Sequence, residues 1–223
     1  MTFVKRAAFA AMTALCACLI FVPAADAARA KSYSLTDAAR AGDLAGVKAF
    51  LAAKADLGAR VPESGDTALI VASRNGHLNV VQALIAAKAD VNARNGNHFT
   101  ALIFAAQNGR RDVVQALIAA HADVDAKSGN GGTALIAAAA FGYPQIVKLL
   151  IAAHADVNAK ADNGYTALIL AAQNGFTQSV ELLIAARADV NAKADDGNTA
   201  LRAASKKGFW GICGLLKNAG GRL

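Results

Sequence analysis

Apolar and polar positions along residues 164–196 follow an order that predicts two short helices and an extended arm. Thr166 precedes a helix-forming run, Ala-Leu-Ile-Leu-Ala-Ala-Gln-Asn, and its hydroxyl can cap the free amides of the first turn. Gly175 follows this run, as expected of a residue that ends a helix with positive φ. A second run, residues 177–186, has apolar side chains at i, i+3 and i+4, which form one buried face. Residues 188–193 then indicate extended chain leading into a tight turn.

The same order recurs with a period of 33 residues. Thr-Ala-Leu begins at Thr67, Thr100, Thr133, Thr166 and Thr199, a glycine follows each first helix at Gly76, Gly109, Gly142, Gly175 and Gly208, and Ala-Asp-Val begins at Ala89, Ala122, Ala155 and Ala188. A fixed period of this size is typical of stacked repeats, whose short helices gain stability only from their neighbours. Positions committed to such repetition leave little room for a catalytic pocket.

These residues resemble the ankyrin repeat family, whose motif is Thr-Pro-Leu-His-x-Ala-Ala-x-x-Gly, followed by an apolar helix and Gly-Ala-Asp-Val-Asn. The chain matches at Thr, Leu, Ala and Gly of the first helix and at Ala-Asp-Val-Asn. The resemblance implies an all-α solenoid of stacked helix-turn-helix units with projecting β-hairpin-like arms. We expect a repeat domain over residues 34–223, made of an N-terminal cap (34–64), four units (65–97, 98–130, 131–163, 164–196) and a C-terminal cap (197–223).

Three departures from the motif change how the units should pack. The family's Pro is Ala throughout, and its His is Ile in four units but Arg at Arg202, so apolar burial replaces a polar ladder. The glycine before Ala-Asp is replaced by Lys54, Lys88, His121, His154 and Arg187. If the backbone there keeps a positive φ, each side chain costs about 1 kcal/mol. A cation at a helix carboxyl end recovers about 0.3–1 kcal/mol of this.

The amino terminus has the pattern of a bacterial-type secretory signal peptide over residues 1–27. Lys5 and Arg6 precede an apolar run, residues 7–22, and Ala-Asp-Ala ends the segment as a cleavage site. A short linker, residues 28–33, would follow. We therefore expect a periplasmic or secreted protein without a transmembrane segment. A lipoprotein anchored at Cys18 is the alternative, which the apolar residues directly after that cysteine disfavour.

Charge and cysteine content narrow the choice of partners. Removal of residues 1–27 would lower the formal charge from +7 to +6, because Lys5, Arg6 and Asp26 leave. This moderate basic bias favours acidic partner surfaces. Nucleic acid is not expected, since the basic residues are not interleaved with stacking aromatics. Cys213 would be the one remaining cysteine; it aligns with inward-facing valines and is interpreted as a buried small hydrophobe rather than a redox thiol.

Candidate metal and catalytic residues are few. His121 and His154 should stack in adjacent units near aspartates, but Lys and Arg occupy the matching positions in other units, so the helix-end interpretation covers the whole set. His77 fits a structural role, and His98 lies on a surface arm where it could touch a partner. No Ser-His-Asp order, carboxylate pair or phosphate-binding glycine loop is present. We expect no enzyme activity, no metal and no cofactor.

Two charged rows follow the arms. The acidic row contains Asp56, Asp90, Asp123, Asp156 and Asp189, and the basic row, four residues later, contains Arg60, Arg94, Lys127, Lys160 and Lys193. We expect the two rows to compensate each other on a solvated face, where each pair contributes little. The alternative is a basic edge that steers an acidic partner.

Positions that vary within the fixed frame are the candidate binding residues. In the ankyrin family they line a concave groove that grips partner proteins, and exposed aromatics with amides are typical of interface hot spots. The residues implied as partner-binding are Arg74, Asn75, Phe99, Gln107, Asn108, Phe141, Tyr165, Gln173 and Asn174. The alternative is that the three aromatics only cover neighbouring arms. Trp210 is expected to cover the open end of the core.

The sequence therefore favours an exported, non-catalytic, monomeric protein-binding module. A secreted effector that engages host proteins would share the same surface and differ only in localisation. A metal-dependent enzyme is the remaining alternative, which stoichiometric zinc or iron in purified protein would support.

Overall fold

The computed structural model describes residues 33–222. Residues 35–223 form one compact unit, the repeat array. The predicted signal peptide, the alternative anchor at Cys18 and nearly all of the predicted linker lie outside the described residues. None of the described helices is long and apolar enough to cross a bilayer.

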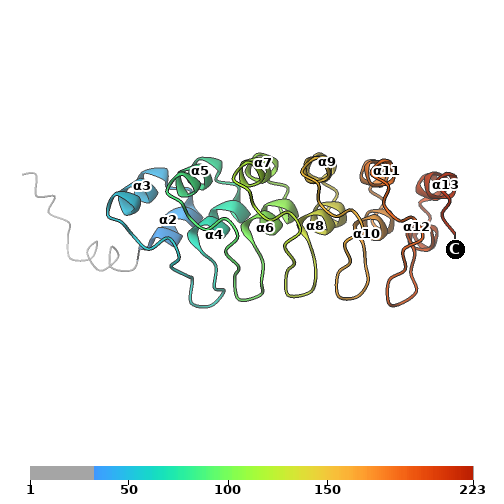
Figure 1. Cartoon of the computed structure of the whole chain (residues 1–223), viewed down its shortest axis with the longest axis horizontal. Helices are drawn as coiled ribbons and strands as arrows, with labels where there is room; N and C mark the ends of the chain where they lie inside the picture. The colour runs from blue at the N-terminus through green and yellow to red at the C-terminus, as the bar shows by residue number, and fades with distance from the viewer. Residues whose placement is uncertain (1–32, 223) are drawn as a thin grey trace, which may run out of the picture. The chain divides into compact units, whose positions relative to one another are not determined.

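The predicted all-α architecture is confirmed, because the array consists of consecutive helix pairs (Figure 1). The helices are α2 (Leu35–Ala41), α3 (Leu44–Ala52), α4 (Ala68–Asn75), α5 (Leu78–Ala86), α6 (Ala101–Gln107), α7 (Arg111–Ala119), α8 (Ala134–Ala140), α9 (Pro144–Ala152), α10 (Ala167–Gln173), α11 (Thr177–Ala185), α12 (Ala200–Lys207) and α13 (Trp210–Asn218). The first helix of each pair packs against the first helices of its neighbours, and the second helices do the same. We call these the inner and the outer helices.

Extended arms connect each pair to the next and project on the side of the inner helices (Figure 1). Backbone pairing within the described arms is sparse, with isolated antiparallel bridges at Arg60–Thr67 and Lys160–Thr166. The arms are instead tied to one another along the array, for example where the Gly129 amide donates to the Asn97 carbonyl at 2.9 Å. Each arm is therefore held by its neighbours, and it positions the residue that precedes the next inner helix.

Threonine begins five of the inner helices, as the sequence predicts. Each threonine has extended φ/ψ, and its hydroxyl accepts a hydrogen bond from the amide three residues later, as Thr166 does from Ile169 at 3.3 Å. Such a cap satisfies one of the four amides that a helix leaves without an internal partner. The cap position also fixes the orientation of the preceding arm residue, such as Phe99 or Tyr165.

The glycine after each of the first five inner helices is required for two reasons. Its φ is positive, at 81° for Gly175, a region that favours glycine. In addition, an added Cβ at Gly175 would lie 2.8 Å from the Phe209 ring of the next unit. The same contact is made by His77, Arg110, Tyr143 and Phe176 over the glycines of the units before them. The turn between the helices of one unit is thus a packing surface for the next.

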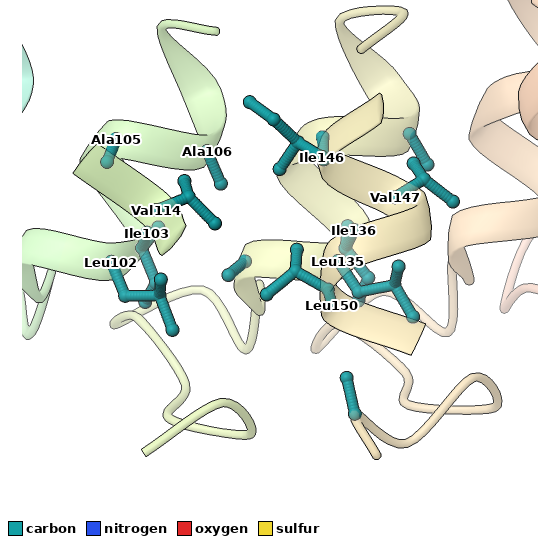
Figure 2. Packing of buried hydrophobic residues seen from close by; sticks show 14 of the residues in the cluster. Leu102, Ile103, Ala105, Ala106, Val114, Leu135, Ile136, Ile146, Val147 and Leu150 are labelled. Atoms are coloured by element: carbon teal, nitrogen blue, oxygen red, sulfur yellow. The ribbon is translucent and has the colours of Figure 1, made fainter. Parts of the chain in front are cut away.

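The core consists of small and branched apolar side chains between neighbouring pairs (Figure 2). Ile70, Ile103, Ile136 and Ile169, which replace the motif histidine, are all buried, whereas the equivalent Arg202 is exposed. Alanines such as Ala105 and Ala106 have no exposed surface and allow the helices to approach closely. Burial at about 25 cal/mol per Å² of apolar surface is the main stabilising contribution of these contacts.

The backbone keeps a positive φ at the five positions where the motif glycine is replaced. Lys54, Lys88, His121, His154 and Arg187 have φ between 56° and 69°, and all five side chains are exposed. His98 also has a positive φ, of 60°, on its arm. Each position therefore carries the backbone strain that a non-glycine residue has in the left-handed region.

The acidic and basic rows do not pair with each other, which corrects the expectation of charge compensation. The ion pairs among residues 33–222 are Arg40–Asp37, Arg74–Asp66 and Arg111–Asp112. Members of the acidic row instead accept from the amide two residues ahead, as Asp156 does from Asn158 at 2.9 Å. In the basic row, the Lys127 ammonium donates to the Lys160 carbonyl at 3.2 Å. The acidic row stabilises turns and the basic row links neighbouring arms, because in both cases a backbone group lies closer than the opposite charge.

Two predictions about single side chains have opposite outcomes. Cys213 is buried, with 4% of its surface exposed, which confirms its interpretation as a core residue. Trp210 does not cover the end of the core, because 71% of its surface is exposed. It occupies the first position of α13, whereas Phe209 beside it packs over Gly175.

Candidate functional site

The predicted binding residues fall in two rows at opposite ends of the inner helices. Phe99 and Tyr165 precede the capping threonines of α6 and α10. The other predicted residues lie at the carboxyl ends, namely Arg74 and Asn75 in α4, Gln107 and Asn108 at α6, Phe141 at α8, and Gln173 and Asn174 at α10. Inner helices of seven or eight residues separate the rows by about 10 Å, at 1.5 Å per residue. We call the surface that includes both rows the arm-side face.

Arg74 joins the two rows. It lies in the last turn of α4, and its guanidinium reaches back to the Asp66 carboxylate at 2.8 Å, in the arm before the same helix. On the way it lies over the Phe104 ring of α6, with the guanidinium carbon 3.8 Å from the ring centroid. Phe104 in turn stacks on Phe99, with 4.8 Å between the ring centroids and 22° between the ring planes. The structure therefore brings Arg74 and Phe99 together through a residue that the sequence reasoning missed.

Asp66 anchors this cluster because it is buried and fully engaged. Only 2% of its side chain is exposed, and its second oxygen accepts a hydrogen bond from the Asn95 amide at 2.7 Å. Asn95 is itself held, because its oxygen accepts from the Phe99 and Asn97 amides. A buried carboxylate needs a counter-charge and hydrogen bonds, so loss of either partner would be costly. This network fixes Arg74 in one conformation.

The resulting arrangement presents one cation and two rings at fixed positions. About a third of the Arg74 side chain is exposed (35%), and Phe99 and Phe104 are half-buried. A guanidinium over an aromatic face contributes about 0.5–1 kcal/mol at exposed sites. Aromatic residues and arginine that are already ordered lose little entropy on binding, a property of interface hot spots. We call Asp66, Arg74, Asn95, Phe99 and Phe104 the Arg74 cluster.

Tyr165 is held by the arm that connects its own unit to the next one. Its hydroxyl donates to the Asp196 carboxylate at 2.7 Å and accepts from the Asn198 amide at 3.0 Å. The Asn198 contact lowers the pKa of Tyr165, but hydrogen bonding to Asp196 and burial raise it more, so the net pKa is raised. The Asn198 backbone amide and then Tyr165 lower the pKa of Asp196. Because this pKa is depressed, the contribution of Asp196 to stability is present near neutral pH and is lost as the solution is acidified below about pH 4.

Several predicted amides have structural partners. Asn75 donates to the Arg40 carbonyl at 3.0 Å and Asn174 to the Ala140 carbonyl at 2.8 Å, each at the end of the preceding inner helix. Asn108 donates to the Phe104 carbonyl of its own helix. The first two contacts satisfy carbonyls that a helix end leaves without an internal partner, whereas the Phe104 carbonyl also accepts from the Asn108 backbone amide. The amides therefore serve the array first, and only their remaining hydrogen-bonding groups face outward.

Phe141 is the most exposed of the predicted aromatics, with 53% of its surface exposed at the end of α8. Gln107 and Gln173 are half-buried in the last positions of α6 and α10. Phe104 and Leu170, also half-buried, occupy a middle position of the inner helices that the sequence reasoning left out. The signal for Phe104 was present, because the equivalent residues in the other units, Val71, Ala137, Leu170 and Ala203, are all smaller.

Other features of the surface do not add a chemical site to the arm-side face. Within the described residues, no group of three or more His, Cys, Asp or Glu side chains is placed to hold a metal ion. A hollow of about 350 Å³ lies at the helix turns around Gly76, Gly109 and Arg110, away from the arms. The arm-side face can therefore interact through aromatic stacking, charge and hydrogen bonding.

Comparison with known sequences fits this arrangement of repeats. A sequence profile of ankyrin repeats, covering three copies, matches residues 35–128, 113–194 and 135–221. A comparison with curated proteins finds no match. Since the profile matches far more than half of the chain and follows its helix pairs, the protein belongs to the ankyrin repeat family.

Proposed function

We propose that this protein is an exported, non-catalytic module that binds one partner protein through its arm-side face. Ankyrin repeats generally mediate protein–protein interaction and are typically non-catalytic. For this chain, the proposal goes beyond that general property in three respects: the location of the binding site, export, and the absence of catalysis. Export rests on the charge and hydrophobicity pattern of residues 1–27.

The observation that carries the proposal is the Arg74 cluster. Its cation and two rings are ordered by a buried carboxylate that makes contacts only inside the protein. Repeat packing alone does not need such a device, because the remaining units do without an equivalent Arg–Phe pair. An ordered arginine beside aromatic rings suits a partner surface with a carboxylate next to an apolar side chain.

Tyr165 and Leu170 extend the same face toward the fourth repeat. We place the centre of binding between Arg74 and Asn174, which spans the predicted residues. The charge of the whole chain, +7 before any processing, favours an acidic partner and would raise the association rate at low salt.

The test begins with affinity purification from periplasmic extract, followed by mass spectrometry of the proteins that co-elute. The purified partner is then titrated against Phe104→Ala. Because truncation of an aromatic hot spot costs at least about 2 kcal/mol, Kd should rise by about 30-fold or more. Trp210→Ala is the matched control, since it also removes a partly exposed ring but from outside the arm-side face.

Thermal unfolding of each variant separates loss of binding from loss of folding. Phe99 and Tyr165 have partners inside the protein, so the double variant Phe99→Ala, Tyr165→Ala should lower stability as well as capture. A folded Phe104→Ala variant that binds the partner as tightly as the unmodified chain would exclude this face. Recovery of the protein itself only from culture medium, and not from periplasmic extract, would favour the secreted-effector alternative.

A further inference from the structure

The final unit differs from all the others in charge. Residues 197–223 contain Arg202, Lys206, Lys207, Lys217 and Arg222, and neither Asp nor Glu. The nearest acidic residues along the chain are Asp195 and Asp196 in the preceding arm, and Asp196 is already bound by Tyr165 and Asn198. Glu181 lies on α11, the outer helix that packs against α13. Most of the excess positive charge of the array is therefore concentrated at one end.

The turn between α12 and α13 also differs from the earlier turns in what lies over its glycine. At the five earlier turns, a side chain of the next unit packs over the glycine. At Gly208, with a φ of 78°, no described atom lies within 4 Å of an added Cβ. Lys206 and Lys207 directly precede this glycine, and both are exposed. Their positive charges and the open backbone of the turn therefore face solvent together.

Trp210 projects from the same turn. Its exposed fraction of 71% is the largest among the big apolar side chains of the described residues. The buried face of α13 consists of Ile212, Cys213 and Leu216, so the packing of the helix does not use the indole. Gly211 and Gly214 on the exposed side of α13 have open space around them. Two glycines weaken a helix by about 0.5–1 kcal/mol each, but here they leave the tryptophan and Lys217 unobstructed by neighbouring side chains.

We propose that this end of the array, which we call the terminal patch (Arg202, Lys206, Lys207, Trp210 and Lys217), docks on the surface of an anionic lipid bilayer. Tryptophan prefers the interface between headgroups and acyl chains, where its ring is buried and its N–H remains hydrated. Lysine and arginine next to it are attracted to anionic headgroups and reach them with long flexible side chains. A bilayer accepts a single protruding ring, whereas a protein partner would need a complementary pocket.

The patch lies apart from the site of the proposed function. The predicted partner-binding residues span Arg74 to Asn174, whereas the terminal patch begins at Arg202. Figure 1 shows α12 and α13 at the end of the row of helix pairs, next to the carboxyl terminus. Docking through this end leaves the arm-side face of the earlier units accessible. The protein would thereby hold its partner at a membrane surface, and the two proposals can fail separately.

The chain itself supplies the probe, because Trp210 is its one tryptophan. The full chain is titrated with vesicles of phosphatidylglycerol and phosphatidylcholine, and with vesicles of phosphatidylcholine alone, while tryptophan emission is recorded. We expect emission to shift to shorter wavelength with the anionic vesicles only. Raising salt to about 0.5 M should reverse the shift, because screening shortens the electrostatic range from about 10 Å at 0.1 M to about 4 Å. An unshifted emission maximum with anionic vesicles would overturn the proposal, even if the chain sediments with them.

Charge-reversal variants test which residues bind the anionic surface. K206E/K207E should lower the partition coefficient by about 25-fold or more, since each basic residue near an anionic surface contributes about a fivefold factor. K48E/K148E is the matched control, because it makes the same change at exposed positions of α3 and α9 and should stay within about twofold. Circular dichroism checks that both variants fold. Equal partitioning of the two variants would refute the assignment of lipid binding to the terminal patch.

Other occupants give distinguishable results. An emission shift that depends on protein concentration without lipid would identify a second copy of the chain and refute lipid docking. A shift with polyglutamate but none with anionic vesicles would identify an acidic polypeptide instead. Phe104→Ala should partition like the unmodified chain, and a loss equal to that of K206E/K207E would overturn the separation of the two sites.

Discussion

The unit of residues 164–196 and the final unit, which begins at residue 197, share their helix lengths almost residue for residue but differ wherever a further repeat would make contact. Ile169 in α10 is buried, and its equivalent Arg202 in α12 is exposed. Gly175 is covered by Phe209, whereas the space around Gly208 is open. The first position of the outer helix does not depend on a further repeat in this way, because Thr177 of α11 and Trp210 of α13 are both exposed.

The comparison teaches that one repeat pattern specifies two kinds of surface. The capping threonine, the turn glycine and the inward face of the outer helix stay the same, because each unit needs them to form and to pack on the unit before it. Ile169 is apolar and lies between units, whereas its equivalent Arg202 is exposed and carries a positive charge. Positive charge at this end also opposes stacking of a second chain on it.

The residues after α13 make contacts that match those between the earlier arms. The Arg222 amide donates to the Asn191 side chain at 2.9 Å, as the Asp189 amide does to Asn158 at 2.7 Å one unit earlier. The Thr199 hydroxyl donates to the Arg222 carbonyl at 3.3 Å. The last residues thus continue the arm-to-arm contacts without adding helices.

Exchanging the equivalent residues 169 and 202 gives the largest expected effect. Ile169→Arg places an unpaired charge in a buried position and should lower the free energy of unfolding by about 3–5 kcal/mol. Arg202→Ile should change it by less than about 0.5 kcal/mol, because that side chain is exposed. Urea unfolding followed by circular dichroism measures both. Similar losses for the two variants would contradict the assignment of an interior and a terminal unit.

Alanine at the two turn glycines separates backbone strain from close approach. Gly175→Ala should cost about 2–4 kcal/mol, because positive φ and overlap with the Phe209 ring both act. Gly208→Ala has the same cost of a positive φ, but the space around the added Cβ is open, so a loss of stability of about 1 kcal/mol is expected. Thermal unfolding of the two variants is the measurement. Equal costs would show that Phe209 moves aside freely.

Cys213 and Val180 occupy equivalent buried positions in α13 and α11. Cys213→Ala should lower the free energy of unfolding by about 1 kcal/mol, as small core truncations do, and partner binding should be unchanged. Cys213→Val restores the volume of the earlier unit and should be close to neutral. Denaturant unfolding measures both variants. Rapid, complete reaction of Cys213 with a thiol reagent in the folded protein would contradict its burial.

The smallest effect is expected at the position where Arg187 has a φ of 63° and the final unit has Gly220. Arg187→Gly relieves about 1 kcal/mol of strain but loses the interaction of a cation with the helix end, worth about 0.3–1 kcal/mol. The net gain in stability should therefore be below about 1 kcal/mol. Gly220→Arg should lower stability slightly. Differential scanning calorimetry of the pair tests the sign, and a clear loss for Arg187→Gly would show that the cation outweighs the strain.

Much of the local structure could be predicted because it depends on neighbouring residues. Thr166 caps α10 and Gly175 ends its turn, as the sequence indicated, and Arg187 has the positive φ that the sequence had raised only as a condition. The candidate site was predicted less completely. Arg74 and Phe99 were identified, but Phe104 was missed, because stacking across two units depends on side-chain directions that a linear pattern does not contain. Trp210 was misplaced for the same reason.

The sequence by itself determined the repeat length, the helices and their caps, and the buried faces, since each follows from contacts within one unit or from a period of 33 residues. Only the tertiary structure decided which side chains meet between units. It joined Asp66, Arg74 and Phe104, separated the acidic row from the basic row, and exposed Trp210. The physical reason is that a carbonyl, carboxylate or ring between two units can be contacted by several residues. Which of them lies close enough depends on the three-dimensional arrangement of the side chains.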